Sequence, residues 1–201
     1  QGYDNESITM LKGPDKVRKR PAVIFGSDGP DGCAHSIFEV ISNSIDEARA
    51  GYGNKIVVTR YQDHSVEVED FGRGCPVDFN KNENRYNWEL VYCELYAGGK
   101  YNADDDNYAY SLGLNGLGLC ATQFASAYMD VEIVRDGYQY NLHFEKGENV
   151  GGLKKAEADG NTDTLEAGFG GFHGDRHSGR ILLRHPPATG CGKPKSAVCL
   201  P

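Results

Sequence analysis

Hydrophobic and polar residues alternate with helical spacing in three parts of the chain. In residues 31–50 apolar residues recur every three or four positions, Asp31 stands where an N-cap is needed, and Gly51 and Gly53 follow the last turn. We therefore predict one long helix there. Its apolar face comprises Ile37, Phe38, Val40, Ile41, Ile45 and Ala48. Residues 87–97 and 117–127 predict two shorter helices, the second opening directly out of a glycine-rich run.

Two antiparallel hairpins are predicted from alternation with a period of two. Residues 55–61 and 65–70 pair through a turn at 62–64, and residues 128–135 and 138–145 pair through Asp136-Gly137. Residues 1–20 read as an extended arm with a short helix that Pro21 stops. Beyond residue 147 the periodicity vanishes. The expected organisation is an arm (1–20), a main domain (21–152) and an atypical tail (153–201).

Composition narrows the class of protein. The 201 residues carry 21 Lys and Arg against 29 Asp and Glu, a formal net charge of −8, which argues against a nucleic-acid-binding module in its own right. No apolar run approaches the roughly 18–20 residues of a membrane span. The six cysteines form no C-x-x-C pair, so we predict buried, reduced thiols in a cytoplasmic protein rather than disulfides or zinc ligands.

Polar residues on the long predicted helix recur every three or four positions and form one stripe. They are His35, Glu39, Asn43, Asp46 and Glu47. A solvated helix face is the alternative, but such a face normally includes Lys and Gln, and this stripe has neither. An amide and carboxylates on one stripe can hold a divalent cation and orient a water molecule.

Two further motifs combine glycines with charge. Asp70 ends a predicted strand and precedes Gly72 and Gly74, so its carboxylate could accept a hydrogen bond from a ligand amine; a simple turn is the alternative. A glycine-rich region begins at Gly98-Gly99-Lys100 and resumes at 112–118, directly before a predicted helix. A helix N-terminus after glycines suits phosphates, whereas a flexible surface loop is the competing interpretation.

Five runs between residues 17 and 118, within a resemblance that extends from about residue 3 to residue 145, together match one family. They are Val17-Arg-Lys-Arg-Pro21, Phe38-Glu-Val-Ile-Ser-Asn-Ser-Ile-Asp-Glu-Ala48, Glu69-Asp-Phe-Gly-Arg-Gly-Cys-Pro76, Tyr96-Ala-Gly-Gly-Lys100 and the glycine loop at 113–118. In these runs the chain resembles the N-terminal ATPase domain of bacterial type IIA DNA topoisomerases, namely the B subunit of DNA gyrase and its topoisomerase IV counterpart. The resemblance implies an α+β fold of the GHKL (Bergerat) class, a two-layer α/β sandwich with a mixed sheet and helices on one face.

The resemblance also implies roles along the acidic helix. Glu39 matches the catalytic general base that polarises the attacking water, and His35 matches the residue that assists it. Asn43 matches the ligand of Mg²⁺, which bridges the triphosphate oxygens of ATP. Glu47 and Arg73 match an ion pair beside the adenine.

Other matched positions surround the nucleotide. Asp70 matches the acceptor of the adenine amino group, Gly74 and Pro76 belong to the adenine pocket, and Arg135 matches an arginine at its rim. The remaining matches form the start of a lid and a phosphate cradle: Gly98, Gly99, Lys100, Leu114, Asn115, Gly116, Leu117 and Gly118.

ATP and Mg²⁺ are therefore the expected cofactors. The expected partners in the parent enzyme are a second copy of the B subunit, bound through the arm that contains Tyr3, the separate DNA-cleaving subunit, and DNA through the full assembly. The expected location is the cytoplasm, without membrane attachment. The family's γ-phosphate lysine belongs to a following transducer domain outside these 201 residues, so we expect little turnover from this chain alone.

Three departures from the family pattern stand out. Asn115 replaces a common His, and Cys75 replaces a common Ile, which keeps the pocket apolar. The family's Thr-Gly-Thr strand and Trp-Lys-Pro-Asp segment are missing after Gly152, so we expect one sheet edge and the floor of the adenine pocket to be lost.

A change of reading frame would explain the divergent tail. Back-translation of residues 165–198, read one nucleotide later, permits Trp-Lys-Pro-Asp-Leu-Glu-Val-Phe and further family-like sequence. We therefore hypothesise a frame change between about residues 152 and 159, which would leave roughly the last forty residues without native packing.

The sequence favours an ATP-binding and ATP-hydrolysing domain of a type IIA topoisomerase B subunit, which drives DNA strand passage or supercoiling. The alternative is a truncated, non-catalytic fragment that binds nucleotide weakly or not at all. A chaperone or mismatch-repair ATPase is disfavoured by the Arg-Lys-Arg-Pro and Tyr-Ala-Gly-Gly-Lys runs. The sequence does not distinguish gyrase from topoisomerase IV.

Overall fold

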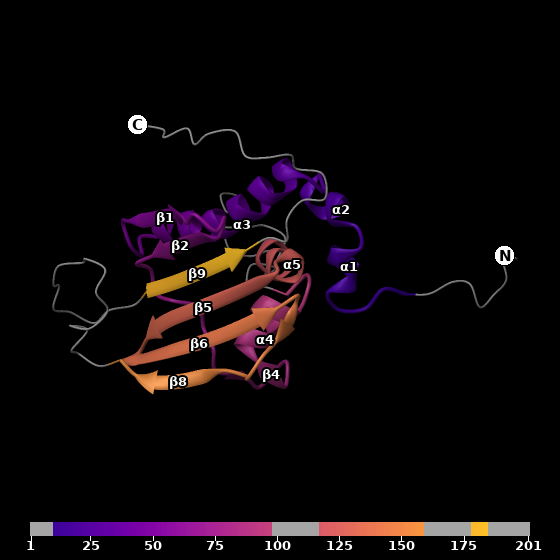
Figure 1. Ribbon diagram of the computed structural model, residues 1–201. Helices are drawn as coiled ribbons and strands as arrows, with labels where there is room; N and C mark the ends of the chain where they lie inside the picture. The colour runs from indigo at the N-terminus through magenta and orange to yellow at the C-terminus, as the bar shows by residue number, and fades with distance from the viewer. Residues whose placement is uncertain (1–9, 98–116, 159–177, 185–201) are drawn as a thin grey trace, which may run out of the picture.

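The computed structural model describes residues 10–97, 117–158 and 178–184. Its main feature is a seven-stranded sheet in the order β1-β2-β9-β5-β6-β7, with β8 paired to β6 (Figure 1). The strands are β1 Ile56–Arg60, β2 Val66–Asp70, β5 Tyr128–Arg135, β6 Tyr138–Glu145, β7 Glu148–Asn149, β8 Lys154–Glu157 and β9 Ser178–Arg184. A separate two-stranded hairpin joins β3 (Phe79–Asn80) to β4 (Arg85–Tyr86).

Every strand pair among the described residues is antiparallel, which corrects the expectation of a mixed sheet. The reason lies in β9, which runs opposite to both of its neighbours, β2 and β5. The two predicted hairpins are confirmed as β1–β2 and β5–β6. Asp136 and Gly137 turn the second hairpin with φ angles of 52° and 77°.

The helices cover one face of the sheet (Figure 1). They are α1 Asp15–Arg18, α2 Pro21–Phe25, α3 Pro30–Arg49, α4 Asn87–Cys93 and α5 Gly118–Ala125. The predicted N-cap of the long helix is wrong: Pro30 is its first residue and Gly29 precedes it, with the Gly29 N–H donating to Ser27 Oγ at 3.0 Å. Pro21 is also the first residue of a helix, α2, because its fixed φ suits the first turn of a helix.

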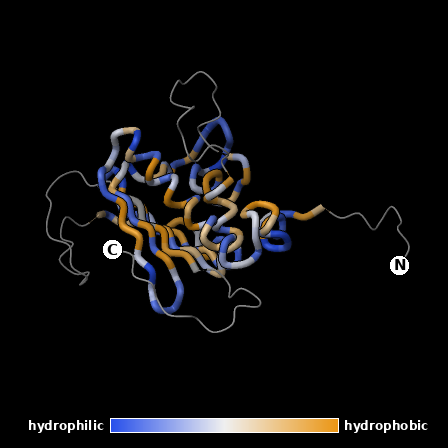
Figure 2. The backbone as a smooth tube through the Cα atoms, turned by 90° about the horizontal axis from the view of Figure 1, so that it is seen from above, coloured by the Kyte–Doolittle hydropathy of each residue, from blue (hydrophilic) through white to orange (hydrophobic). Residues whose placement is uncertain are grey.

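The main core lies between the sheet and these helices, where Figure 2 shows hydrophobic segments facing one another. Met129, Val131 and Ile133 alternate toward it from β5. The predicted apolar face of α3 is wrong at Phe38, whose exposed fraction is 64%. Instead α3 buries a line of mostly small residues: Gly32, Ser36, Val40 and Ser44. Small side chains let α5 approach closely, and Thr122 Oγ1 donates to the Ser36 carbonyl at 3.1 Å.

Arg18, from the basic run, secures the C-terminal end of α5. Its Nη1 donates to the carbonyl oxygens of Phe124 and Ser126, each at 2.9 Å. A cation at this position satisfies the last carbonyls and opposes the negative end of the helix dipole. The N-terminal segment thereby holds in place the helix whose other end faces α3.

The structure differs from the expectation of an unpacked tail at two segments. β8 pairs with β6, and β9 lies in the interior of the sheet between β2 and β5. We expected the divergent tail to cost the sheet one edge strand. Instead, part of that tail forms β9, a strand inside the sheet. Leu183 is 1% exposed and joins the main core.

Candidate functional site

The polar stripe on α3 is present as predicted and carries an internal hydrogen bond. His35 Nε2 donates to Glu39 Oε1 at 3.1 Å. Asn43 Nδ2 donates to the main-chain carbonyl of Glu39 at 3.1 Å, which leaves the amide oxygen Oδ1 for a ligand. The helical repeat places these three side chains above one another. The imidazole therefore orients the Glu39 carboxylate.

The N-terminus of α5 lies directly against that carboxylate. A Cβ atom built on Gly118 would stand 2.0 Å from Glu39 Oε2, so only glycine fits this contact. Free N–H groups and the positive end of the dipole are found at a helix N-terminus, where anions are favoured. Leu117 and Gly118 are the only residues of the predicted cradle that the structure describes.

Asp70, at the end of β2, has a donor on each carboxylate oxygen. Ser44 Oγ donates to Oδ2 at 2.9 Å, and the Gly72 N–H donates to Oδ1 at 3.0 Å. Ser44 lies on α3 between the Asn43 and Glu47 positions and is 5% exposed. Ser44 was not among the predicted site residues, although its position within the polar helix was a usable signal. Together these two bonds hold the carboxylate in one orientation.

Glu47 and Arg73 form the predicted ion pair. Arg73 Nε and Nη2 donate to Glu47 Oε1 and Oε2 at 2.7 and 2.9 Å, and the Arg73 main-chain N–H donates to Oε1 at 2.9 Å. The hydrogen bonds to Glu47 raise the pKa of the guanidinium above its ordinary value. Gly72 permits this approach, because a Cβ there would lie 2.3 Å from Glu47 Cγ.

The loop after β2 is also bound by β5. Arg135 Nη1 donates to the carbonyl oxygen of Gly74 at 3.1 Å. Next to it, Cys75 packs against the main core, and burial raises the pKa of its thiol to about 12. The thiol is thus neutral and unreactive. Pro76 is exposed beside it.

Several predicted positions lie outside the described residues. They are Tyr3, Gly98, Gly99, Lys100, Leu114, Asn115 and Gly116. Residues 35, 39, 43, 47, 70, 73, 74, 76, 117, 118 and 135 are described. Of these, the structure joins the α3 stripe to α5 through Gly118 and to the loop after β2 through Asp70 and Arg73.

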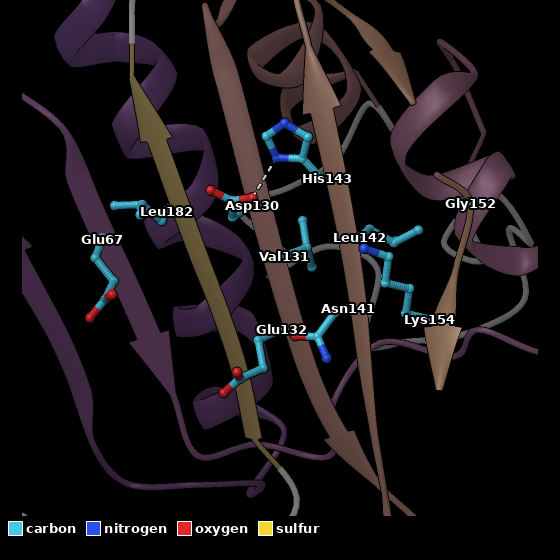
Figure 3. A pocket seen from close by; sticks show the side chains of 10 residues that line it. All are labelled: Glu67, Asp130, Val131, Glu132, Asn141, Leu142, His143, Gly152, Lys154 and Leu182. Carbon is cyan, nitrogen blue, oxygen red and sulfur yellow. Dashed lines mark hydrogen bonds and ion pairs between the residues drawn. The ribbon is translucent and has the colours of Figure 1, made fainter. Parts of the chain in front are cut away.

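A hollow of about 370 Å³ lies elsewhere, on the sheet face opposite the helices (Figure 3). Glu67, Leu182, Asp130 and His143 cross it in one row of paired strand positions. None of the predicted site residues lines it. The candidate site is therefore the cluster around α3, not this open face.

The described residues contain neither a metal-ion cluster nor a membrane-spanning helix. No group of three or more His, Cys, Asp and Glu side chains in these segments is arranged to hold a metal ion. In the same segments no helix has both the length and the apolar character that crossing a bilayer requires.

A helix stripe with a carboxylate and an amide, a helix N-terminus against that carboxylate, and a carboxylate-tipped strand beside the same helix match the expected nucleotide-binding domain of the GHKL class. A scan against protein-family models finds no match. The DNA gyrase B subunit of Thermotoga maritima is 45% identical over 148 residues, which cover 74% of this chain and 23% of the relative. The DNA topoisomerase 4 B subunit of Francisella tularensis is 41% identical over 147 residues, covering 73% of this chain and 23% of the relative.

Solved structures agree with these relatives. The topoisomerase IV ATP-binding domain of Francisella tularensis, in complex with a small-molecule inhibitor, matches with a TM-score of 0.64 and 30% identity, covering 88% of this chain and 74% of that one. The 43K ATPase domain of Thermus thermophilus gyrase B, in complex with an aminocoumarin, matches with a TM-score of 0.64 and 26% identity, covering 87% and 39%. The chain belongs to the family of ATP-binding domains of type II topoisomerase B subunits. It spans about a quarter of the length of its curated relatives.

Proposed function

We propose that this chain binds ATP with Mg²⁺ on the polar face of α3, and that the longer protein hydrolyses ATP to drive DNA strand passage. The contact between Glu39 and Gly118 carries the proposal. It puts a carboxylate that can act as general base beside a helix N-terminus that suits phosphates. Membership of the topoisomerase family supports ATP as the nucleotide.

The nucleotide would lie along α3. Residues 39 and 47 are separated by about 12 Å along the helix axis, from the rise of 1.5 Å per residue. The triphosphate belongs at the Glu39 and α5 end, with the adenine at the Glu47 end. There Asp70 accepts a hydrogen bond from the adenine amino group, and Glu47 with Arg73 flanks the base. Gly74, Pro76 and Arg135 complete the rim.

In the proposed reaction Glu39 accepts a proton from the water that attacks the terminal phosphorus. The bond from that phosphorus to the bridging oxygen breaks, so ADP and phosphate leave. The His35 N–H holds Oε1 of Glu39, which leaves Oε2 for the water. Removal of a general base commonly costs about 10²- to 10⁴-fold in rate.

Mg²⁺ fits this site as a nucleotide-bound ion. Asn43 offers one amide oxygen, and the described residues contain no cluster that would hold a metal ion alone. Mg²⁺ usually keeps several waters and is bound through few protein groups plus substrate phosphates. When bound, it neutralises charge on the triphosphate. The role of Asn43 is to place that charge one helical turn from Glu39.

The wider assembly is proposed from the relatives, whose length this chain covers only in part. The DNA-cleaving subunit, a second copy of the B subunit bound through the arm with Tyr3, and DNA are the proposed partners. Residues Gly98, Gly99 and Lys100 would form the lid, and Leu114, Asn115 and Gly116 would complete the cradle with Leu117 and Gly118. We propose a cytoplasmic location. Gyrase and topoisomerase IV relatives match almost equally, so both classes fit.

Nucleotide titration with thermal unfolding tests this function. A melting temperature that rises with ATP concentration, and rises further with Mg²⁺, supports an intact site. No rise at any concentration would favour the non-catalytic fragment instead.

The variant Glu39→Ala tests the base. Turnover, measured in this chain and in the longer protein that contains it, should fall at least about 100-fold while the ATP-dependent rise in melting temperature remains. Glu132→Ala, on the opposite sheet face, is the matched control and should leave both quantities unchanged. Equal turnover in Glu39→Ala and the unmodified chain would remove Glu39 from this role.

A further inference from the structure

An aromatic residue after the end of α3 lies against the adenine-side ion pair. The Arg73 Cζ atom is 3.6 Å from the centroid of the Tyr52 ring. Glu47 also restrains Arg73, because its carboxylate accepts hydrogen bonds from two nitrogens of the guanidinium. We propose that Tyr52 is a positioning residue of the adenine site, which holds the Arg73 guanidinium in the plane that stacks beside the base. This inference rests on the proposed function.

The end of α3 explains why Tyr52 reaches this position. Gly51 has a φ of +89°, and its N–H donates to the Ala48 carbonyl at 3.0 Å. The Tyr52 N–H then donates back to the Glu47 carbonyl at 3.1 Å. This pair of bonds is a Schellman motif, in which the second residue beyond the cap folds back over the last turn. The motif fixes Tyr52 beside Glu47, the partner of Arg73.

A second close approach fixes the loop on the Arg73 side. Gly53 has a φ of +79°, and a Cβ there would lie 2.8 Å from the carbonyl oxygen of Phe71. The chain after Tyr52 therefore packs directly on the chain just before Arg73. The main chain before and after Tyr52 therefore fixes the position of its ring, in addition to the side-chain rotamer.

The ring matters because the ion pair is partly solvated. The Arg73 side chain is 51% exposed, and a single ion pair at such exposure restrains a long side chain only weakly. A guanidinium is planar and stacks on aromatic rings. With one face on Tyr52 and its edge on Glu47, Arg73 keeps its other face for a planar base. An exposed contact of this kind is worth about a two- to fivefold change in affinity.

Calorimetry with two probes tests the inference in the full chain. ATP reports on both ends of the site, and inorganic tripolyphosphate reports on the phosphate end alone. Tyr52→Ala should raise the Kd for ATP about two- to fivefold and leave the Kd for tripolyphosphate unchanged. Tyr52→Phe retains the ring and should restore ATP affinity. In an Arg73→Ala background, Tyr52→Ala should have no further effect.

Tyr61→Ala is the matched control, because Tyr61 is 42% exposed, close to the 44% of Tyr52, and lies at the start of the turn after β1. Unchanged ATP affinity in Tyr52→Ala would overturn the inference, as would equal losses for ATP and tripolyphosphate or an undiminished loss without Arg73. Absence of ATP binding by the unmodified chain would instead overturn the proposed function itself, so the two failures are distinct.

Discussion

At the scale of single residues, Asp70 shows how hydrogen bonds fix the orientation of a carboxylate in the site. A free carboxylate rotates, and the proposed contact with an adenine amino group requires one orientation. Ser44 and the Gly72 N–H each donate to a different oxygen, so rotation would break both bonds. The hydroxyl comes from the same helix that carries Glu39. One helix therefore orients groups at both ends of the proposed nucleotide.

Replacing Ser44 by Ala should weaken ATP binding about three- to tenfold, because Asp70 loses one of its two donors. Calorimetric titration of ATP measures the change. Ser42→Ala is the control: Ser42 is on the same helix, but its hydroxyl donates to the Phe38 carbonyl at 2.7 Å. A Ser44→Ala variant with the affinity of the Ser42→Ala variant would show that Gly72 alone orients Asp70.

At the scale of elements, the contact between α3 and α5 positions the proposed catalytic end of the site. α3 supplies small buried residues along one line, and α5 begins with Gly118 against Glu39. Arg18 of α1 holds the far end of α5. The position of the helix N-terminus relative to Glu39 therefore depends on packing along the whole interface.

Gly118→Ala should disturb this contact, because the added methyl group would overlap both the carboxylate and the Cβ of Glu39. We expect a loss of about 1–3 kcal/mol in the free energy of unfolding. Turnover should fall with it, since Glu39 must move. Gly29→Ala is the control, because its added methyl group would meet only Ser27 Oγ at 3.5 Å. Urea unfolding of the two variants compares them; similar midpoints would contradict the close packing of α5 on α3.

The β5–β6 hairpin carries a titratable histidine between two carboxylates on the open sheet face. His143 Nδ1 lies 2.6 Å from Asp130 Oδ1, and Nε2 lies 3.2 Å from Glu145 Oε1, the first of which Figure 3 marks. The hydrogen bond to Asp130, and secondarily that to Glu145, raises the pKa of His143 above 6.5. A raised pKa means that the folded state binds the proton more tightly than the unfolded state.

The stabilising contribution of His143 should therefore be complete below pH 6.5 and decline as the pH rises through the elevated pKa of the folded state. Unfolding free energies of the unmodified chain and of His143→Gln, measured across this range, should differ at low pH and converge at high pH. A difference that stayed constant with pH would assign His143 a packing role only.

At the scale of the whole molecule, β9 joins the two halves of the sheet. β1 and β2 lie on one side of it, and β5 and β6 on the other. Without β9, the inner edges of β2 and β5 would lose their main-chain partners, and buried unpaired groups are costly. The frame-change hypothesis for residues beyond 152 concerns the gene and stays a prediction, which sequencing across this region tests.

Two neighbouring leucines test the register of β9. Leu183 is 1% exposed in the core, whereas Leu182 lines the hollow on the opposite face. Leu183→Ala should cost about 2–5 kcal/mol of unfolding free energy, and Leu182→Ala less than about 1 kcal/mol. Chemical denaturation measures both. Equal, small effects would show that this strand is not in the sheet and that the tail is unpacked.

Local pattern predicted some of these features closely. Residues 128–135 and 138–145 are the observed bounds of β5 and β6, because strict alternation and an Asp-Gly turn specify a hairpin locally. The polar stripe of α3 followed from helical spacing. Phe38 was mispredicted because the partner of α3 is a close-packed helix that selects small residues. Ser44 and Tyr52 were missed because their partners lie 26 and 21 residues away in sequence.

The sequence alone determined the helices α3, α4 and α5, the hairpins β1–β2 and β5–β6, the acidic stripe, and the family to which the site belongs, because these depend on spacing over a few residues. Only the tertiary structure decided that β9 completes the sheet, that Gly118 faces Glu39, and that Tyr52 stacks on Arg73. Those contacts join segments far apart in the chain. Their free energy arises from burial and pairing that exist only once the elements have packed, so no local pattern encodes them.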